Sequence, residues 1–173
     1  MPDNISSSKH DILLRTATAA DADAAAEIAA EVFEGVSFDF LVEQRYGLLA
    51  GTSWQERKAA EVRNEVLSNP AWTLIAEVDG EVVGFVTTSM SEHPPVGHIL
   101  NLAVAKKWQG HGIGKKLLEA AYRMLRERGA RYLQIETLET NEVGKHLYPR
   151  LGFREIVRKI YYFMEVDEWA GPQ

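Results

Sequence analysis

Two periodicities of apolar residues run along the chain and predict its secondary structure. Apolar or alternating runs predict strands over 11–16, 72–78, 81–89, 96–104, 131–138 and 153–166. Apolar residues at helical spacing predict helices over 19–33, 53–67, 115–128 and 141–150. Residues 34–52 are too apolar for a free linker, and we expect a short helix and a loop there. The order β-α-α-β-β-β-α-β-α-β predicts an α/β (α+β) fold, with a mixed central sheet and helices on both faces.

Residues at the ends of these segments support the boundaries. Ser53 precedes a helix as an expected N-cap, and Glu56 completes a capping box with it. The pair Asp79-Gly80 between two strand-like runs predicts a tight hairpin. Pro149 lies inside the last predicted helix and is expected to end it early, because proline removes a backbone donor.

Composition narrows the class of protein. The 173 residues, of which 46% are hydrophobic and 25% charged, predict one domain over 11–173 after a polar, flexible tail over 1–10. A net charge of -6 argues against general nucleic-acid binding, which needs a broad basic surface. The chain has no cysteine, which excludes disulfides, thiolate metal ligands and a cysteine acyl-enzyme. The five histidines lack the spacing of metal ligands, so we expect no metal.

Two further features bear on location. No apolar run approaches the length of a membrane helix, about 20 residues. The N-terminal residues lack the apolar core of a secretory signal. We therefore expect a cytoplasmic protein that has no membrane partner.

The segment 104–116, VAKKWQGHGIGKK, carries the strongest chemical signal. It joins an apolar strand to a helix, and its glycines predict a tight turn whose free backbone N–H groups point beyond the helix N-terminus. Such a terminus binds anions, usually a phosphate. Lys115 and Lys116 lie in the first helical turn, where cations oppose the helix dipole, so their presence indicates that a polyanion docks there. The alternative is a solvated basic turn whose glycines only allow tight packing.

Known phosphate loops match this segment to different degrees. A Walker A loop has glycines one residue further apart than Gly110 and Gly114, and needs Ser or Thr where this chain has Lys116. A Rossmann loop needs G-x-G-x-x-G and a β-α-β repeat, and neither is present. The pattern Q-x-x-G-x-G, formed by Gln109, Gly112 and Gly114, resembles the acyl-CoA pyrophosphate loop of the GNAT superfamily of N-acetyltransferases.

A second motif, far from the first, resembles the same family. Asn141, Tyr148 and the run Leu151-Gly152-Phe153 fit the family's N-x6-Y-x2-L-G-F segment. The resemblance covers residues 11–166 and includes the element order of the GNAT fold, whose sheet is mostly antiparallel. One departure is Lys106, where the family often has proline.

The resemblance implies an acetyl-CoA-dependent N-acetyltransferase. It implies direct transfer of an acetyl group from acetyl-CoA, the cosubstrate, to a primary amine of a small molecule or peptide in a ternary complex. Many members of the family are dimers, which favours a homodimer. One alternative is a non-catalytic acyl-CoA-binding sensor or structural module of the same fold, and another is a nucleotide-binding domain.

By resemblance, one strand and one turn hold acetyl-CoA. The backbone amides of the turn hold the pyrophosphate, and a backbone N–H of the central strand, where that strand bulges over Leu102 to Val104, polarises the carbonyl oxygen. Asn141 either binds the cofactor or the substrate, or caps its own helix. The expected cofactor-binding residues are Leu102, Ala103, Val104, Gln109, Gly110, His111, Gly112, Ile113, Gly114, Lys115 and Asn141.

Two side chains are candidates for proton transfer. By resemblance Tyr148 protonates the departing thiolate, and the alternative is a core tyrosine packed near Phe153. The base that deprotonates the amine is less well marked, because Leu100 stands where many family members have glutamate. His98 shares a strand face with that position and is the candidate base. The alternatives are a solvated edge histidine with no such role, bulk or relayed water, and three nearby side chains, Glu92, His93 and Glu136.

Overall fold

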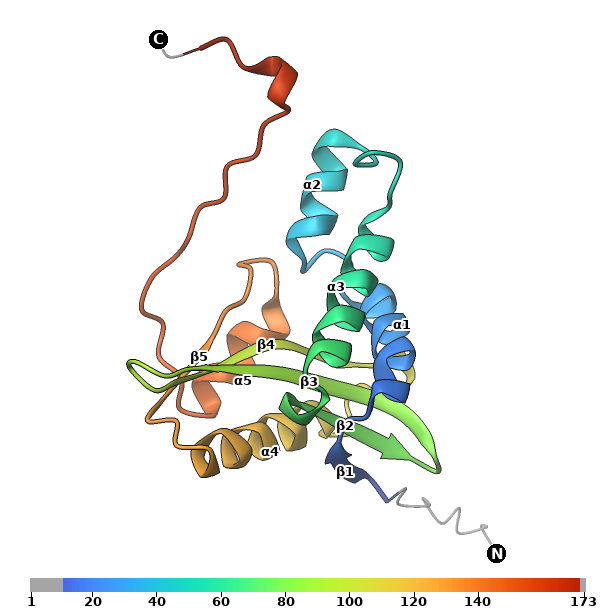
Figure 1. Cartoon of the computed structure of the whole chain (residues 1–173), viewed down its shortest axis with the longest axis vertical. Helices are drawn as coiled ribbons and strands as arrows, with labels where there is room; N and C mark the ends of the chain where they lie inside the picture. Colours follow the sequence, from blue (N-terminus) through green and yellow to red (C-terminus); the bar gives the residue numbers. More distant parts are fainter. Residues whose placement is uncertain (1–10, 172–173) are drawn as a thin grey trace, which may run out of the picture.

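A five-stranded sheet forms the middle layer of the computed structural model, which describes residues 11–171 (Figure 1). The strands lie across the sheet in chain order. Neighbours from the first to the fourth strand are antiparallel, and the fifth is parallel to the fourth. The predicted mixed, mostly antiparallel sheet is therefore confirmed. Its strands are β1 (Leu13–Thr16), β2 (Thr73–Val78), β3 (Glu81–Ser91), β4 (Val96–Val104) and β5 (Tyr132–Ile135).

Helices cover both faces of the sheet, as predicted (Figure 1). They are α1 (Ala22–Val32), α2 (Phe38–Tyr46), α3 (Trp54–Ser68), α4 (Ile113–Glu127) and α5 (Glu142–Arg150). α1 and α3 pack on one face, where Ile75 and Phe85 are fully buried. α4 packs on the opposite face against a second cluster that includes Val86. Among residues 11–171, no helix has both the length and the apolar content needed to cross a bilayer.

Local signals in the sequence correspond to contacts in the structure. The Ser53 hydroxyl accepts from the Glu56 amide at 3.3 Å, and the Glu56 carboxylate accepts from the Ser53 amide at 2.7 Å, which is the predicted capping box. Asp79 and Gly80 both have positive φ, 51° and 82°, and form the predicted two-residue turn between β2 and β3. These contacts fix where α3 begins and how β2 and β3 pair.

The C-terminal part of the chain differs from the prediction. The alternation over 153–166 predicts a strand, but residues 154–165 form an extended segment that leaves the sheet and pairs with no strand of the described chain (Figure 1). A strand needs a neighbour that exchanges backbone hydrogen bonds with it, and β5 does not fill that role here. Pro149 also ends its helix less abruptly than expected. It lies in the last turn of α5, which ends one residue later, at Arg150.

An ion pair with a buried carboxylate ties β1 to the chain that enters α1. Both oxygens of the Asp21 carboxylate accept from the Arg15 guanidinium, at 2.7 and 2.8 Å, and Asp21 is only 6% exposed. These hydrogen bonds are the main reason that the pKa of Asp21 is lowered to about 2, against the opposing effect of burial. Backbone and side-chain hydrogen bonds from Thr18 lower it further.

We expect Asp21→Asn to lower the free energy of unfolding at neutral pH by about 2 kcal/mol. A carboxyl whose pKa is depressed by folding stabilises the protein above its unfolded-state pKa, and this contribution is lost as pH falls through the folded-state pKa. The difference between variant and wild type should therefore shrink between about pH 4 and pH 2 in urea titrations. Asp23→Asn, at an exposed position of α1, is the control. A difference independent of pH would contradict the assignment to the Asp21 carboxylate.

Candidate active site

The central strand β4 breaks its regular pairing just before the predicted cofactor-binding stretch. Asn101 pairs with Thr87, and Ile99 pairs with the next residue of β3, so Leu100 is an extra, bulged residue. The parallel pairing of β4 with β5 ends at Ile99. The bulge that we predicted over Leu102–Val104 therefore lies two residues earlier, and the predicted stretch follows it with β3 as its paired neighbour.

Backbone N–H groups beyond the bulge point alternately to the two edges of β4. The amides of Asn101 and Ala105 donate toward β3, at 3.1 and 2.9 Å. Since successive amides of a strand point in opposite directions, those of Leu102 and Val104 point to the edge that β5 has left. Ala103, between them, is buried against α1 and α3. A strand amide directed to such an edge can donate to a carbonyl oxygen.

The turn between β4 and α4 keeps its backbone open. Gly110 and Gly112 have φ of 81° and 76°, and no atom lies within 4 Å of the place that a Cβ would occupy in either residue. The Gln109 side chain turns back, and its Nε2 donates to the Val104 carbonyl at 3.0 Å. It therefore ties the turn to the end of β4. His111 Nδ1 lies 3.0 Å from the Gln109 carbonyl oxygen, within the same turn.

α4 begins at Ile113 with Gly112 as its N-cap. The first amides of a helix have no carbonyl one turn before them, and a glycine cap offers no side chain to fill that role. The buried Ile113 anchors this turn in the core, and Gly114 follows it with only an ordinary contact at the position of a Cβ. Lys115 is exposed and lies 3.7 Å from Glu119. This end of the helix combines free amides, the positive end of the dipole and lysines, so it suits an anion.

α5 carries Tyr148 on the side that packs against the core formed by α4 and the sheet. Its ring lies edge-on to that of Phe153, with 6.2 Å between centroids, so the packing contact named in the alternative interpretation is present. Burial raises the pKa of Tyr148. A tyrosine that keeps its proton well above neutral pH is available as a proton donor while negative charge develops on a leaving sulfur. Its role as an acid stays a prediction.

Asn141 and Gly144 set the position of that tyrosine. Asn141 Oδ1 accepts from the Gly144 amide at 3.0 Å, and its Nδ2 donates to Thr137 Oγ1 at 2.9 Å. The capping role of Asn141 is therefore confirmed, and its cofactor-binding role stays a prediction. A Cβ on Gly144 would lie 2.9 Å from both Asn141 Nδ2 and the Tyr148 ring. The cap, the glycine and the tyrosine form one packed unit.

His98 lies on the part of β4 that is paired on both sides, before the bulge. It is half-buried, and its Nε2 lies 2.8 Å from the Ser91 hydroxyl. Its role as a base stays a prediction.

Within residues 11–171, His, Asp and Glu side chains form no cluster of three that could hold a metal ion.

A hollow of about 320 Å³ lies between α3 and the sheet, next to the bulge. Glu65 of α3, Thr87 of β3 and the bulged Leu100 contribute to its lining. Glu65 Oε2 accepts from Thr87 Oγ1 at 2.6 Å and from Asn101 Nδ2 at 2.9 Å. Glu61, one turn earlier, accepts from the same amide at 3.2 Å. Two carboxylates therefore converge beside the bulge. Glu61 is already paired with the buried Lys58 at 2.9 Å, so Glu65 is the carboxylate that a cationic ligand in the hollow would meet.

This acidic group was not predicted from the sequence. Two signals could have indicated it. Asn101 is a polar residue in a mostly apolar strand, and it is buried, so it needs partners for its amide. Glu61 and Glu65 are four residues apart and thus share one face of α3.

Comparisons with known proteins agree with the geometry. The model of the acetyltransferase (GNAT) family matches residues 37–153. An N-alpha-acetyltransferase of Sulfurisphaera tokodaii is 30% identical over 105 residues, which cover 54% of this chain and 63% of the relative. An aminoglycoside N(6′)-acetyltransferase type 1 of Stenotrophomonas maltophilia is 32% identical over 105 residues, which cover 56% of this chain and 68% of the relative. The matches span 63%, 38% and 65% of the length of the first three curated relatives.

A solved structure extends the likeness to the whole fold. The PaiA N-acetyltransferase of Thermoplasma acidophilum, solved in complex with coenzyme A, gives a TM-score of 0.66. The superposition covers 83% of this chain and 90% of that chain, with 21% sequence identity. At this identity the likeness concerns the fold alone.

Proposed function

Since the chain belongs to the acetyltransferase (GNAT) family, we propose that it transfers an acetyl group from acetyl-CoA to a primary amine of a small molecule or peptide. Transfer is direct, in a ternary complex: the amine nitrogen forms a bond to the acetyl carbon, and the thioester C–S bond breaks. The observation that carries the proposal is the junction of β4 and α4. There, amides of β4 point to the edge that β5 has left, and the strand continues into a glycine turn that also has free amides.

The turn from Gln109 to Lys115 fits the pyrophosphate of acetyl-CoA. The open space at Gly110 and Gly112 lets phosphate oxygens approach the backbone closely. The free amides at the start of α4 then donate to those oxygens. Gln109 holds the turn in place through its bond to the Val104 carbonyl. Bound acetyl-CoA supplies the activated acyl group, and the chain supplies binding and polarisation.

Two groups of the chain act on the thioester. The Leu102 amide donates to the carbonyl oxygen, which gains negative charge during attack. The Tyr148 hydroxyl gives its proton to the departing sulfur. The raised pKa of Tyr148 supports this role, because the hydroxyl is protonated at neutral pH. His98, hydrogen-bonded to Ser91, is the candidate acceptor for the proton that the amine must lose.

The carboxylate of Glu65 in the lining of the hollow supports the proposal that the acceptor is an amine that arrives as an ammonium ion. Amines with a pKa near 10 are mostly protonated at neutral pH, so carboxylates concentrate them. Glu65 lines the hollow, and Asn101 links it to Glu61. The names of the relatives agree with an amine acceptor, since one is an N-alpha-acetyltransferase and another an aminoglycoside acetyltransferase.

Calorimetry followed by a turnover assay tests the proposal. We expect acetyl-CoA to bind at one site, with no comparable heat from ATP or NAD. Release of CoA is then measured with a polyamine, an aminoglycoside and a peptide with a free N-terminus, and at least one should turn over. Binding of acetyl-CoA without turnover across the panel would favour a non-catalytic sensor. Absence of binding would overturn the assignment of the turn.

Glu65→Gln separately tests whether the hollow beside the bulge binds the acceptor amine. The amide keeps an oxygen for Thr87 and Asn101 but removes the charge. We expect KM for a cationic amine to rise about 5-fold, which corresponds to the loss of one partly exposed charge interaction of about 1 kcal/mol. The affinity for acetyl-CoA should not change. Glu27→Gln, at an exposed position of α1, is the matched control. An equal rise in KM there would mean that the protein's net charge, and not a contact with Glu65, attracts the amine.

A further inference from the structure

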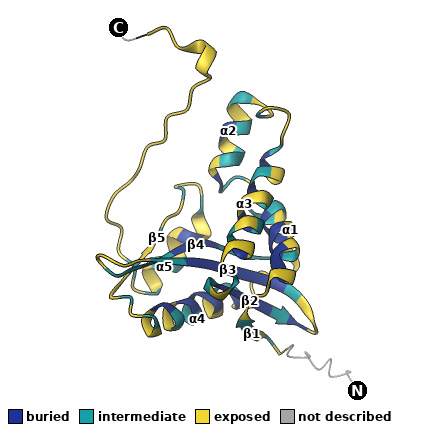
Figure 2. Cartoon of the chain, viewed as in Figure 1, coloured by how far each residue is buried: buried dark blue, intermediate teal, exposed yellow. Residues whose placement is uncertain are grey.

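A side chain of the neighbouring strand holds the residue that follows the bulge of β4. The Asn101 amide donates to the hydroxyl of Thr87, on β3, at 3.1 Å. Figure 2 shows the middle of β3 buried, and Thr87 and Asn101 are only 1% and 4% exposed. Regular antiparallel strands pair through main-chain groups, so the hydroxyl adds a side-chain contact at the point where the bulge disturbs the pairing.

Glu65 of α3 fixes the direction of that hydroxyl. A hydroxyl has one proton, and Thr87 donates it to Glu65 Oε2 at 2.6 Å. The Thr87 oxygen is therefore left to accept from the Asn101 amide. The Asn101 side chain closes a ring, because its Nδ2 donates to the same Glu65 oxygen at 2.9 Å. These three hydrogen bonds, which we call the bulge ring, join one helix to two strands.

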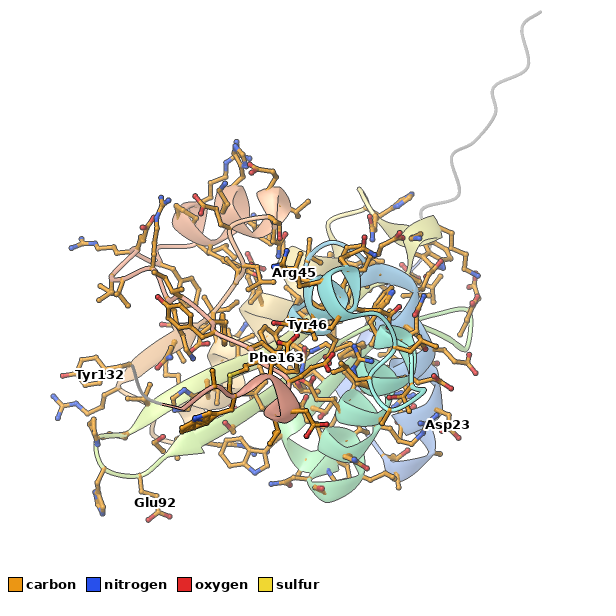
Figure 3. All side chains as sticks on the ribbon, turned by 90° about the horizontal axis from the view of Figure 1, so that it is seen from above. Asp23, Arg45, Tyr46, Glu92, Tyr132 and Phe163 are labelled. Atoms are coloured by element: carbon orange, nitrogen blue, oxygen red, sulfur yellow. The ribbon has the colours of Figure 1, made fainter. Side chains whose placement is uncertain are left out.

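The bulge ring lies at the border between the covered and the open part of the sheet. Figure 3 shows the ends of the sheet near Glu92 and Tyr132 extending beyond α1 and α3. Thr87 and Asn101 are buried, whereas Glu65 lines the hollow beside the bulge. Hydrogen bonds to a charged group are stronger than neutral ones, and burial strengthens them further. The bulge ring is therefore a stiff support next to an accessible surface.

The peptide group that follows Asn101 carries the Leu102 amide. A peptide group is rigid and planar, so the backbone angles of the residue before it set the direction of its N–H. The bulge ring fixes Asn101 both at its own amide and at its side chain. It therefore restricts the direction of the Leu102 amide, which points to the edge that β5 has left.

We propose that Thr87 is a positioning residue for acetyl transfer. Its hydroxyl, oriented by Glu65, holds Asn101 so that the Leu102 amide meets the carbonyl oxygen of bound acetyl-CoA. The inference rests on the proposed function, in which that amide is the donor. A donor stabilises developing charge best when it is in place before the reaction, so loosening the bulge ring lowers kcat. The main chain of β4 alone does not set the donor: a buried threonine of β3 and a carboxylate of α3 set it as well.

Infrared spectroscopy of acetyl-CoA, isotopically labelled at its acetyl carbonyl and bound to the full chain, tests this role. A hydrogen bond to the carbonyl oxygen weakens the C=O bond and lowers its stretching frequency, and no acceptor needs to be present. We expect a lowered frequency in the wild type. Thr87→Val keeps the branched side chain without the hydroxyl and should lose most of this shift. At saturating amine, kcat should fall about 10-fold, less than the loss of a whole donor would cause.

Two further variants separate positioning from general stability. Thr87→Ser keeps the hydroxyl and should retain both the lowered frequency and kcat. Thr88→Val is the matched control. Thr88 is the next residue of β3 and is 5% exposed, and its hydroxyl donates to the Trp72 carbonyl at 2.7 Å instead of joining the bulge ring. Its loss removes a comparable buried hydrogen bond and should leave the carbonyl frequency as in the wild type.

The possible outcomes distinguish this inference from the proposed function. If Thr87→Val keeps the lowered frequency and kcat of the wild type, Thr87 does not position the donor, and the proposed function stands. Loss of the shift in Thr87→Ser, or an equal loss in Thr88→Val, would also overturn the positioning role. A wild type that does not bind acetyl-CoA would overturn the proposed function itself.

Discussion

Replacing Tyr148 by phenylalanine is expected to lower kcat by at least about 100-fold while leaving the affinity for acetyl-CoA unchanged, because a positioned general acid contributes about 100-fold or more. Phenylalanine keeps the edge-on contact with Phe153 and removes only the hydroxyl. The departing thiolate then takes its proton from water. Pre-steady-state measurement of CoA release, together with calorimetric titration of acetyl-CoA, separates these two quantities.

The pH profile gives a second readout for the same residue. Burial raises the pKa of Tyr148, so a proton donor at this position works until the pH passes that raised value. Wild-type kcat should fall on the alkaline side as Tyr148 ionises, and this limb should vanish in Tyr148→Phe. Tyr122→Phe, at an exposed position of α4, is the control for a generic loss of a hydroxyl. Unchanged turnover in Tyr148→Phe would leave Tyr148 as a packing residue and move the acid role elsewhere.

The position of Tyr148 depends on a group of residues that is local in sequence. The cap by Asn141, the missing side chain at Gly144 and the ring of Tyr148 all lie within eight residues, and their contacts repeat at helical spacing. Local spacing also fixes the glycine turn and its helix. This is why these parts of the site were accessible from the sequence, with the motifs of a known family to identify them.

The parts that were missed or wrong depend on contacts between distant segments. Asn101 meets Glu65 across 36 residues, and no local pattern specifies which helix face covers a strand. The position of the bulge at Leu100 depends on the register between β3 and β4, and the alternation of apolar residues alone does not predict that register. The C-terminal alternation is the clearest case. A period of two predicts an extended segment correctly, but it does not specify whether a neighbouring strand pairs with that segment.

Gln109 connects the two sets of backbone amides on which the proposed reaction depends, those of β4 and those of the glycine turn. Its side chain holds the Val104 carbonyl, which points to the same edge of β4 as the Leu102 amide. The donor for the acetyl carbonyl and the amides for the phosphates are therefore fixed relative to one another through one strand and one turn. Both sets are main-chain groups that a substitution does not remove, so substitutions test them only where the backbone conformation needs a particular residue. Gly112 is such a position, with φ of 76° at the N-cap of α4.

Gly112→Val should weaken acetyl-CoA binding by about 100-fold, since each hydrogen bond from an amide to a charged phosphate contributes about 1.5–3 kcal/mol. Valine is strained at this φ and places methyl groups in the open space where phosphate oxygens would approach. Gly35→Val is the matched control, because Gly35 has φ of 73° and equally open space, in the loop after α1 and outside the turn. Both variants carry the same backbone strain, so calorimetric titration of acetyl-CoA isolates the effect on the turn. Equal affinity in the two variants would mean that Gly112 serves only the fold, and that the phosphates bind elsewhere.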